Sequence, residues 1–131
     1  VSQSLWNDVP MIKRAKILQL AADWIRHHDH YLTTILMKEV GKTHAEARDE
    51  ILRSADMIDY FAHEGLHLKG EEMTGDAFPG YEKTKMAIVE RVPLGVILAI
   101  SPFNYPVNLS VSKIAPALIT GNAVIFKPPS Q

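Results

Sequence analysis

Cysteine is absent from this sequence of 131 residues. Its absence excludes disulfide bonds, thiolate metal sites and a cysteine nucleophile within the chain. An excess of one charge is missing too, because 14 basic and 15 acidic side chains leave a formal net charge of -1. This balance gives no reason to expect nucleic acid or an anionic membrane as a partner. The composition, 47% hydrophobic and 22% charged, is typical of a globular domain.

Long apolar runs are also missing. No run approaches the length that spans a bilayer, and the N-terminus has no signal-peptide pattern, so we expect a cytoplasmic protein. The length corresponds to one domain or to part of one. The sequence begins at Val1 without a methionine and stops soon after an apolar segment, so we expect a piece of a longer protein.

The first two-thirds of the chain have the periodicity of helices. The pattern predicts helices over 11–28, 30–40 and 44–67. The third helix is the clearest, because a single apolar stripe runs along it and charged residues fill the rest. A segment rich in Gly, Pro, Glu and Asp over 68–84 predicts a surface loop, and the pattern over 86–92 predicts a strand.

The last third has a strand–helix–strand pattern. The apolar run 96–100 predicts a parallel strand covered on both faces. A helix is expected over 107–120, kinked or shortened by Pro116, and a second buried strand over 123–126. Such a βαβ unit makes the predicted fold class α/β, with N-terminal helices followed by the start of a parallel sheet. Two parallel strands cannot cover themselves, so the sheet is expected to be incomplete.

The stretch 63–67 reads HEGLH and matches the pattern H-E-x-x-H. A zinc peptidase would use His63 and His67 as metal ligands and Glu64 as the base. Gly65, however, weakens a helix by about 1 kcal/mol relative to alanine, where ligand geometry must be rigid. We interpret the stretch as an exposed helix end, and keep a zinc peptidase as the alternative function from a different class.

The stretch SPFNYP, residues 101–106, follows the first buried strand directly. Ligands of open parallel sheets gather at the carboxyl ends of the strands, and Lys127 lies at the end of the other strand. Asn104, held between prolines, could donate a hydrogen bond to charge that develops on a substrate oxygen. Lys127 could bind a ribose or a phosphate. The alternatives are an asparagine that satisfies loop carbonyls and a lysine that extends along the strand end.

Three segments resemble the aldehyde dehydrogenase superfamily: ERVPLGVILAISPFNYP over 90–106, KIAPAL over 113–118 and GN over 121–122. Within it, FNYPVNL and the ending KPP are most similar to NADP-dependent non-phosphorylating glyceraldehyde-3-phosphate dehydrogenases. The resemblance implies an incomplete aldehyde dehydrogenase fold, with residues 1–131 as the N-terminal part of a Rossmann-like cofactor-binding domain. This family lacks the glycine fingerprint of other dinucleotide-binding sheets. Residues 84–92 resemble a strand of its oligomerisation element.

The resemblance also implies site residues. Asn104 matches an amide of the oxyanion hole. The cofactor groove would take in residues 100–103, namely Ile100, Ser101, Pro102 and Phe103. Lys127 matches a lysine that contacts the adenosine ribose. Ser130 favours NADP as the cofactor, because a hydroxyl can donate to a 2′-phosphate that a carboxylate would repel. NAD is the alternative cofactor.

For the substrate, the resemblance implies that Arg53 and Tyr105 hold a phosphate. From the residues alone, Arg53 is a surface ion-pair partner of Asp49. The implied reaction oxidises D-glyceraldehyde 3-phosphate to 3-phosphoglycerate with NADP, through a cysteine thioester. Another small aldehyde, with NAD or NADP, is the alternative within the class. The family's cysteine and general-base glutamate lie far downstream, so this chain alone is expected to be inactive. We expect the intact cytoplasmic enzyme of glycolysis to be a homo-oligomer, a dimer or a tetramer, with no metal.

Overall fold

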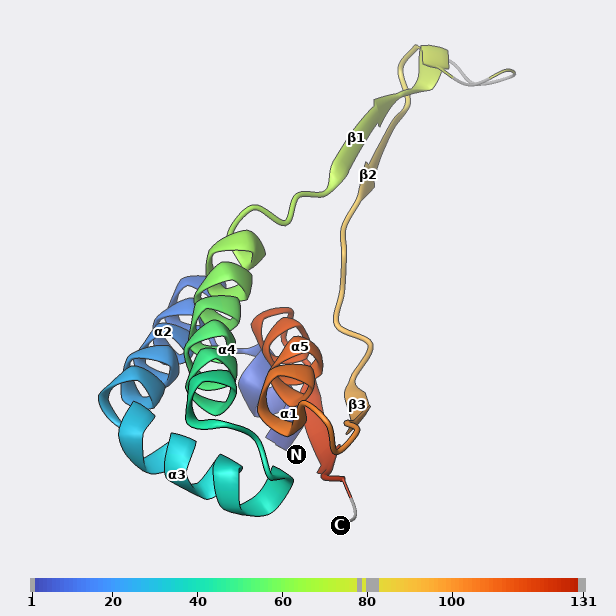
Figure 1. Cartoon of the computed structure of the whole chain (residues 1–131). Coiled ribbons are helices and arrows are strands. Elements are labelled where there is room, and N and C mark those ends of the chain that lie inside the picture. The colour runs from blue at the N-terminus through green and yellow to red at the C-terminus, as the bar shows by residue number, and fades with distance from the viewer. Residues whose placement is uncertain (1, 78, 80–82, 130–131) are drawn as a thin grey trace.

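The computed structural model describes residues 2–77, 79 and 83–129 (Figure 1). Its elements follow one another along the chain as α1 (Ser2–Asn7), α2 (Met11–His27), α3 (Asp29–Val40), α4 (His44–Gly65), β1 (Glu71–Thr74), a 3-10 turn (Gly75–Ala77), β2 (Met86–Val89), β3 (Val96–Ile100), α5 (Pro106–Ile119) and β4 (Ala123–Lys127). The three long N-terminal helices agree with the predicted ones to within two residues at each end.

The core lies where α2, α4 and α5 pack together. Small side chains at the contacts let the helix backbones approach closely, and the apolar stripe predicted for α4 is buried throughout. A second cluster lies under α3 and is built on Leu36, Ala47 and Ile51. The members of the main core cluster are Ala15, Leu18, Ala22, Ala55, Ile58, Ala62, Ala115 and Ile119.

The start of α4 is fixed by a capping box. The Thr43 hydroxyl accepts from the Glu46 amide, and the Glu46 carboxylate accepts from the Thr43 amide at 3.0 Å. Bonds from the Thr43 hydroxyl and amide hold the pKa of Glu46 below its ordinary value. These contacts satisfy backbone donors that a helix start would otherwise leave unpaired. They therefore determine where α4 begins.

The end of α4 lies very close to α5. A Cβ atom at Gly65 would lie 2.1 Å from Cγ1 of Ile119, a distance that no packed side chain tolerates. Glycine at this position is thus explained by the packing of two helices, whatever role the surrounding histidines have.

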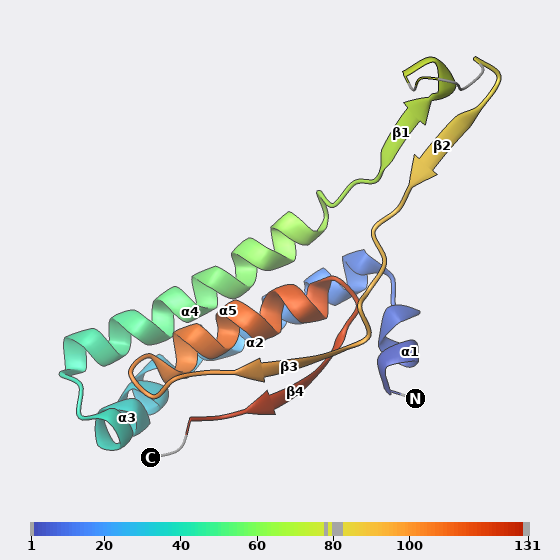
Figure 2. The same ribbon diagram turned by 90° about the vertical axis from the view of Figure 1, so that its right-hand side faces the viewer.

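Strands β3 and β4 form a parallel pair, and α5 lies between this pair and α4 (Figure 2). The predicted βαβ unit is confirmed, and α5 continues through Pro116 to Ile119. The expectation that β3 is covered on both faces is wrong for this chain. Among the described residues, α5 covers one face of the pair and α1 contacts β4, so Val96, Leu98 and Ile100 stay exposed on the other face. Strand β4 was likewise expected to be buried, and its last three residues are exposed.

The segment between α4 and β3 forms an arm that extends away from the helices (Figures 1 and 2). Strands β1 and β2 pair antiparallel in it, with Glu71 opposite Val89. The surface loop predicted over 68–84 is therefore wrong where β1 and the 3-10 turn lie. Strand β2 lies within the strand predicted over 86–92, and each of its residues is exposed, so burial does not alternate along it.

The N-terminal turn α1 is held against α5 by side chains. Trp6 donates from Nε1 to the Leu118 carbonyl at 2.8 Å. The buried guanidinium of Arg14 donates to the carbonyls of Ile119, Asn7 and Val9 at 2.8–3.2 Å. Burial lowers the pKa of Arg14. Within the described part of the chain, the helices are too short or too polar to cross a membrane.

Candidate active site

The turn SPFNYP lies between the carboxyl end of β3 and the start of α5. Its first residue, Ser101, is buried, and the hydroxyl of Ser110 on α5 donates to the Ser101 oxygen at 2.9 Å. The same Ser110 hydroxyl contacts the Pro106 carbonyl. The Ser110 side chain thus ties the start of the turn to α5, while Pro102 and Phe103 stay exposed.

Asn104 lies at the outer part of this turn and is exposed. No hydrogen bond to another described residue holds its side-chain amide. The alternative stated above, an asparagine that satisfies carbonyls of its own loop, is therefore not what the structure has. The amide is available to donate to a ligand at the carboxyl edge of the sheet.

Lys127 ends β4 at the same edge. The parallel register places Ile100 opposite Lys127, and partners in a parallel pair point to the same face. Both residues are exposed there, so a hydrophobic and a cationic side chain stand next to each other at the rim of the uncovered face. Ser130, the residue expected to select the cofactor, lies outside the described residues.

An apolar hollow opens on the other side of the strands, toward the helices. Side chains from the carboxyl ends of both strands meet the first turns of α5 there, with α3 along the other wall. The residues that join the two strand ends are Phe103, Val107, Phe126, Pro128 and Pro129. The two strand ends thus form one continuous edge.

Arg53 lies on the exposed face of α4. Its side chain is 68% exposed, and Nη1 lies 3.4 Å from Oδ2 of Asp49, four residues earlier. The surface ion pair expected from the spacing is confirmed. Exposed pairs of this kind contribute little to stability. The guanidinium can therefore leave Asp49 and bind a stronger anion with little loss of free energy. Binding of a substrate phosphate by Arg53 stays a prediction.

The ring of Tyr105 contacts Lys42, a residue that no motif of the sequence marks as part of a site. The Lys42 ammonium lies 3.5 Å from the centroid of the Tyr105 ring. Lys42 also pairs with Glu50, whose other oxygen accepts from the amides of Val107 and Asn108. A signal for Glu50 exists in the sequence, because it falls between Ala47 and Ser54 on the buried face of α4.

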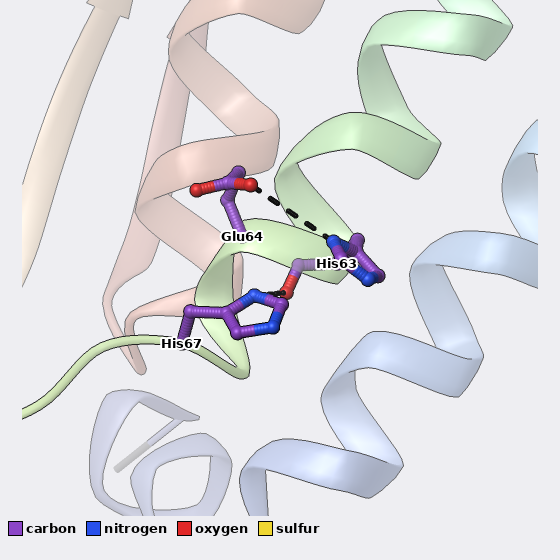
Figure 3. A group of neighbouring side chains, drawn as sticks. All are labelled: His63, Glu64 and His67. Carbon is purple, nitrogen blue, oxygen red and sulfur yellow. Dashed lines mark hydrogen bonds and ion pairs between the residues drawn. The ribbon is translucent and has the colours of Figure 1, made fainter.

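The HEGLH stretch forms the surface group drawn in Figure 3. Ligand atoms of His63, Glu64 and His67 lie within 4.8 Å of one another, and all three side chains are exposed. His67 follows the end of α4, with its Nδ1 atom 3.1 Å from the His63 carbonyl oxygen. This arrangement agrees with an exposed helix end, and the zinc peptidase alternative gains no support from the comparisons below.

Comparison with known proteins gives one consistent family. The model of the aldehyde dehydrogenase family matches residues 2–131. An NADP-dependent glyceraldehyde-3-phosphate dehydrogenase of Pisum sativum is 48% identical over 132 residues, which cover 99% of this chain and 27% of the relative. The enzyme of the same name from Streptococcus equinus is 46% identical, again over 99% of this chain and 27% of the relative.

The fold agrees with the sequence comparison. A crystal structure of NADP-dependent glyceraldehyde-3-phosphate dehydrogenase from Bacillus halodurans C-125, complexed with NADP, superposes with a TM-score of 0.94 and 48% identity. The match covers 97% of this chain and 27% of that chain. The chain therefore spans about a quarter of the length of the relatives that it matches.

Proposed function

This chain belongs to the aldehyde dehydrogenase family, and we propose that it is the N-terminal part of an enzyme that oxidises D-glyceraldehyde 3-phosphate with NADP. The product is 3-phosphoglycerate, and one water is consumed for each aldehyde oxidised. The names of the relatives from Pisum sativum and Bacillus halodurans support both the cofactor and the substrate. The chain has no cysteine, so the nucleophile of this proposal comes from residues outside it.

The carboxyl edge of the sheet fits NADP. Ser101 is buried and bonded to α5, which fixes the backbone over which the nicotinamide end would lie, with Ile100, Pro102 and Phe103 exposed beside it. Lys127 offers a cation for the ribose and its 2′-phosphate, helped in this proposal by Ser130. NADP, when bound, supplies the two-electron acceptor of the reaction.

Asn104 acts in this proposal on the substrate carbonyl. When a nucleophile attacks the aldehyde carbon, negative charge develops on the oxygen, and a fixed amide donor stabilises that charge. The exposed, unbonded amide of Asn104 at the strand end supports this role. Arg53 and Tyr105 hold the phosphate of the substrate, through a guanidinium and a phenol hydroxyl that both donate.

The same proposal makes the complete enzyme a cytoplasmic homo-oligomer, a dimer or a tetramer, that works in glycolysis. The β1–β2 arm supports the assembly, because it carries exposed Met86, Ile88 and Val89 away from the helical body. An apolar strand of this kind, uncovered on both sides, is suited to contact another subunit.

The single observation that carries the proposal is the free amide of Asn104 at an edge that it shares with Lys127. The test uses the complete enzyme and follows NADPH formation with D-glyceraldehyde 3-phosphate. Asn104→Ala is expected to lower kcat by about 10²–10³-fold, the usual cost of one oxyanion donor. Asn7→Ala, at an exposed asparagine that ends α1, is the matched control and should leave kcat unchanged.

Two results would contradict the proposal at different levels. Absence of NADP-dependent oxidation of the phosphorylated aldehyde by the complete enzyme would refute the activity. Retention of kcat within about threefold in Asn104→Ala would leave the activity standing and remove the role of Asn104.

A further inference from the structure

Glu50 carries a buried charge that the proposed reaction does not use. The residue is 2% exposed, and its side chain lies between α4 and the first turn of α5. A buried carboxylate costs free energy unless it is paired and hydrogen-bonded, and apolar residues of the same volume often pack at least as well. The three contacts of this carboxylate therefore indicate which part of the structure its charge holds in place.

The first two contacts are directed at the start of α5. Oε1 of Glu50 accepts from the amides of Val107 at 2.9 Å and Asn108 at 3.1 Å. Tyr105 precedes α5 and supplies no side-chain cap of its own. A carboxylate from another helix thus takes the place of the missing cap, where the positive end of the helix favours a negative charge.

The third contact reaches the other side of the same turn. Oε2 of Glu50 pairs with the ammonium of Lys42, which lies over the ring of Tyr105. The side chain of Lys42 is only 13% exposed, so this cation–π contact is partly desolvated and correspondingly strong. Glu50 and Lys42 thus hold the backbone after Tyr105 and the ring of Tyr105 itself.

Asn104 immediately precedes Tyr105 in the chain. Its amide has no bond of its own among the described residues, so its orientation depends on the backbone of the turn. Ser101 and Ser110 anchor the strand side of the turn, and Glu50 with Lys42 anchors the helix side. An error of about 1 Å in such a group can cost about 100-fold in rate.

We propose that Glu50, assisted by Lys42, is a positioning residue that holds the turn so that the Asn104 amide meets the substrate oxygen. This inference rests on the proposed function and adds to it a residue that touches neither substrate nor cofactor. The charge of Glu50 fixes the position of the Asn104 amide in two ways. It accepts directly from two backbone amides of α5, and through Lys42 it holds the ring of Tyr105.

The experiment measures kcat and KM of the complete enzyme with Glu50→Gln, using both phosphorylated and plain glyceraldehyde. Glutamine keeps the volume and one oxygen acceptor but loses the charge that faces Lys42. We expect kcat to fall by about 10- to 100-fold with both aldehydes, while KM for NADP stays within about twofold. Asp56→Asn is the matched control, because this exposed carboxylate on α4 pairs with Arg26 and should leave kcat unchanged.

A double-mutant cycle separates positioning from a general loss of structure. In an Asn104→Ala background, Glu50→Gln should cost less than about threefold further, because the group that it positions is already gone. If Glu50→Gln lowers kcat equally in the presence of Asn104 and in the Asn104→Ala background, the inference is overturned and the role of Asn104 stays intact. If Asn104→Ala itself has no effect, it is the proposed function of Asn104 that fails.

Lys42→Met keeps the experiment decisive if Glu50→Gln does not fold. This variant leaves the bonds of Glu50 to α5 in place and removes the cation over Tyr105. A fall in kcat that disappears in the Asn104→Ala background supports positioning. An unchanged kcat in Lys42→Met, or a loss that adds fully to that of Asn104→Ala, would overturn it.

Discussion

Replacing Gly65 with alanine is expected to destabilise the chain, although alanine is the better helix former. The added Cβ would lie 2.1 Å from Cγ1 of Ile119 and 3.1 Å from its Cδ1. Ile119 is 2% exposed and belongs to the main core cluster, so it has no free space into which to move. Either α4 and α5 separate, or Ile119 adopts an unfavourable rotamer.

The magnitude follows from two opposing terms. Alanine gains about 1 kcal/mol over glycine in a helix interior, and less at its last residue. Overpacking a well-packed core costs about 1–3 kcal/mol. Carbon atoms in contact are normally about 3.5–4.0 Å apart, so an approach to 2.1 Å places the cost near the upper end. The net loss in free energy of unfolding is therefore about 1–2 kcal/mol.

Urea denaturation of the chain, followed by far-ultraviolet circular dichroism, measures this loss. With an m-value of about 1.5–2 kcal/mol/M, the midpoint should fall by about 0.5–1.3 M. The control is Ile119→Ala, which removes the Cγ1 and Cδ1 atoms, so that in its background Gly65→Ala should cost much less than in the unchanged chain. A midpoint that rises in Gly65→Ala alone would show that helix propensity outweighs the close approach, and would refute this reasoning.

Four further outcomes are expected. Arg53→Leu in the complete enzyme should raise KM for the phosphorylated aldehyde by about 10- to 100-fold but not for plain glyceraldehyde; equal losses would refute phosphate binding. Ser130→Glu should shift the cofactor preference from NADP toward NAD, and an unchanged preference would contradict selection by Ser130. The pKa of Glu46 is lowered by bonds from Thr43, so its stabilisation is present above the unfolded pKa and lost as pH falls through the lower folded one. Glu46→Gln should therefore flatten the loss of stability below about pH 4.3 in acid titrations followed by circular dichroism, and an unchanged slope would speak against it. Metal analysis should find no stoichiometric zinc, whereas zinc that is lost in His63→Ala would revive the peptidase alternative.

The long helices could be predicted because each buries one stripe of apolar residues at helical spacing. Ile51, Ala55, Ile58 and Ala62 recur at helical spacing on α4, and the core is built on that face. The short helix α1 could not be predicted, because six residues show no periodicity and its side-chain bond to α5 joins residues 112 positions apart. Strand β1 was missed because its sequence, EEMT, has a single apolar residue and shows no alternation, whereas its partner β2 falls within the strand predicted over 86–92.

The site was predictable only at the strand ends. An apolar strand followed by Asn104 between prolines, and a second one ending at Lys127, indicate a ligand edge whatever the rest of the fold. Glu50 was missed although it falls on the buried face of α4, because a glutamate on an amphipathic helix is ordinarily solvated. Its burial depends on Val107 and Asn108, 57 and 58 residues later, and no local pattern contains that contact.

The buried guanidinium of Arg14 has a practical consequence for where such a chain can be cut. Two of its close acceptors, the carbonyls of Asn7 and Val9, precede α2, and the third belongs to Ile119 at the far end of the core. A shortened version that starts at Met11 would leave a positive charge enclosed with too few acceptors. Residues 7–9 are therefore needed to satisfy the buried cation of α2, and a truncated version should begin before them.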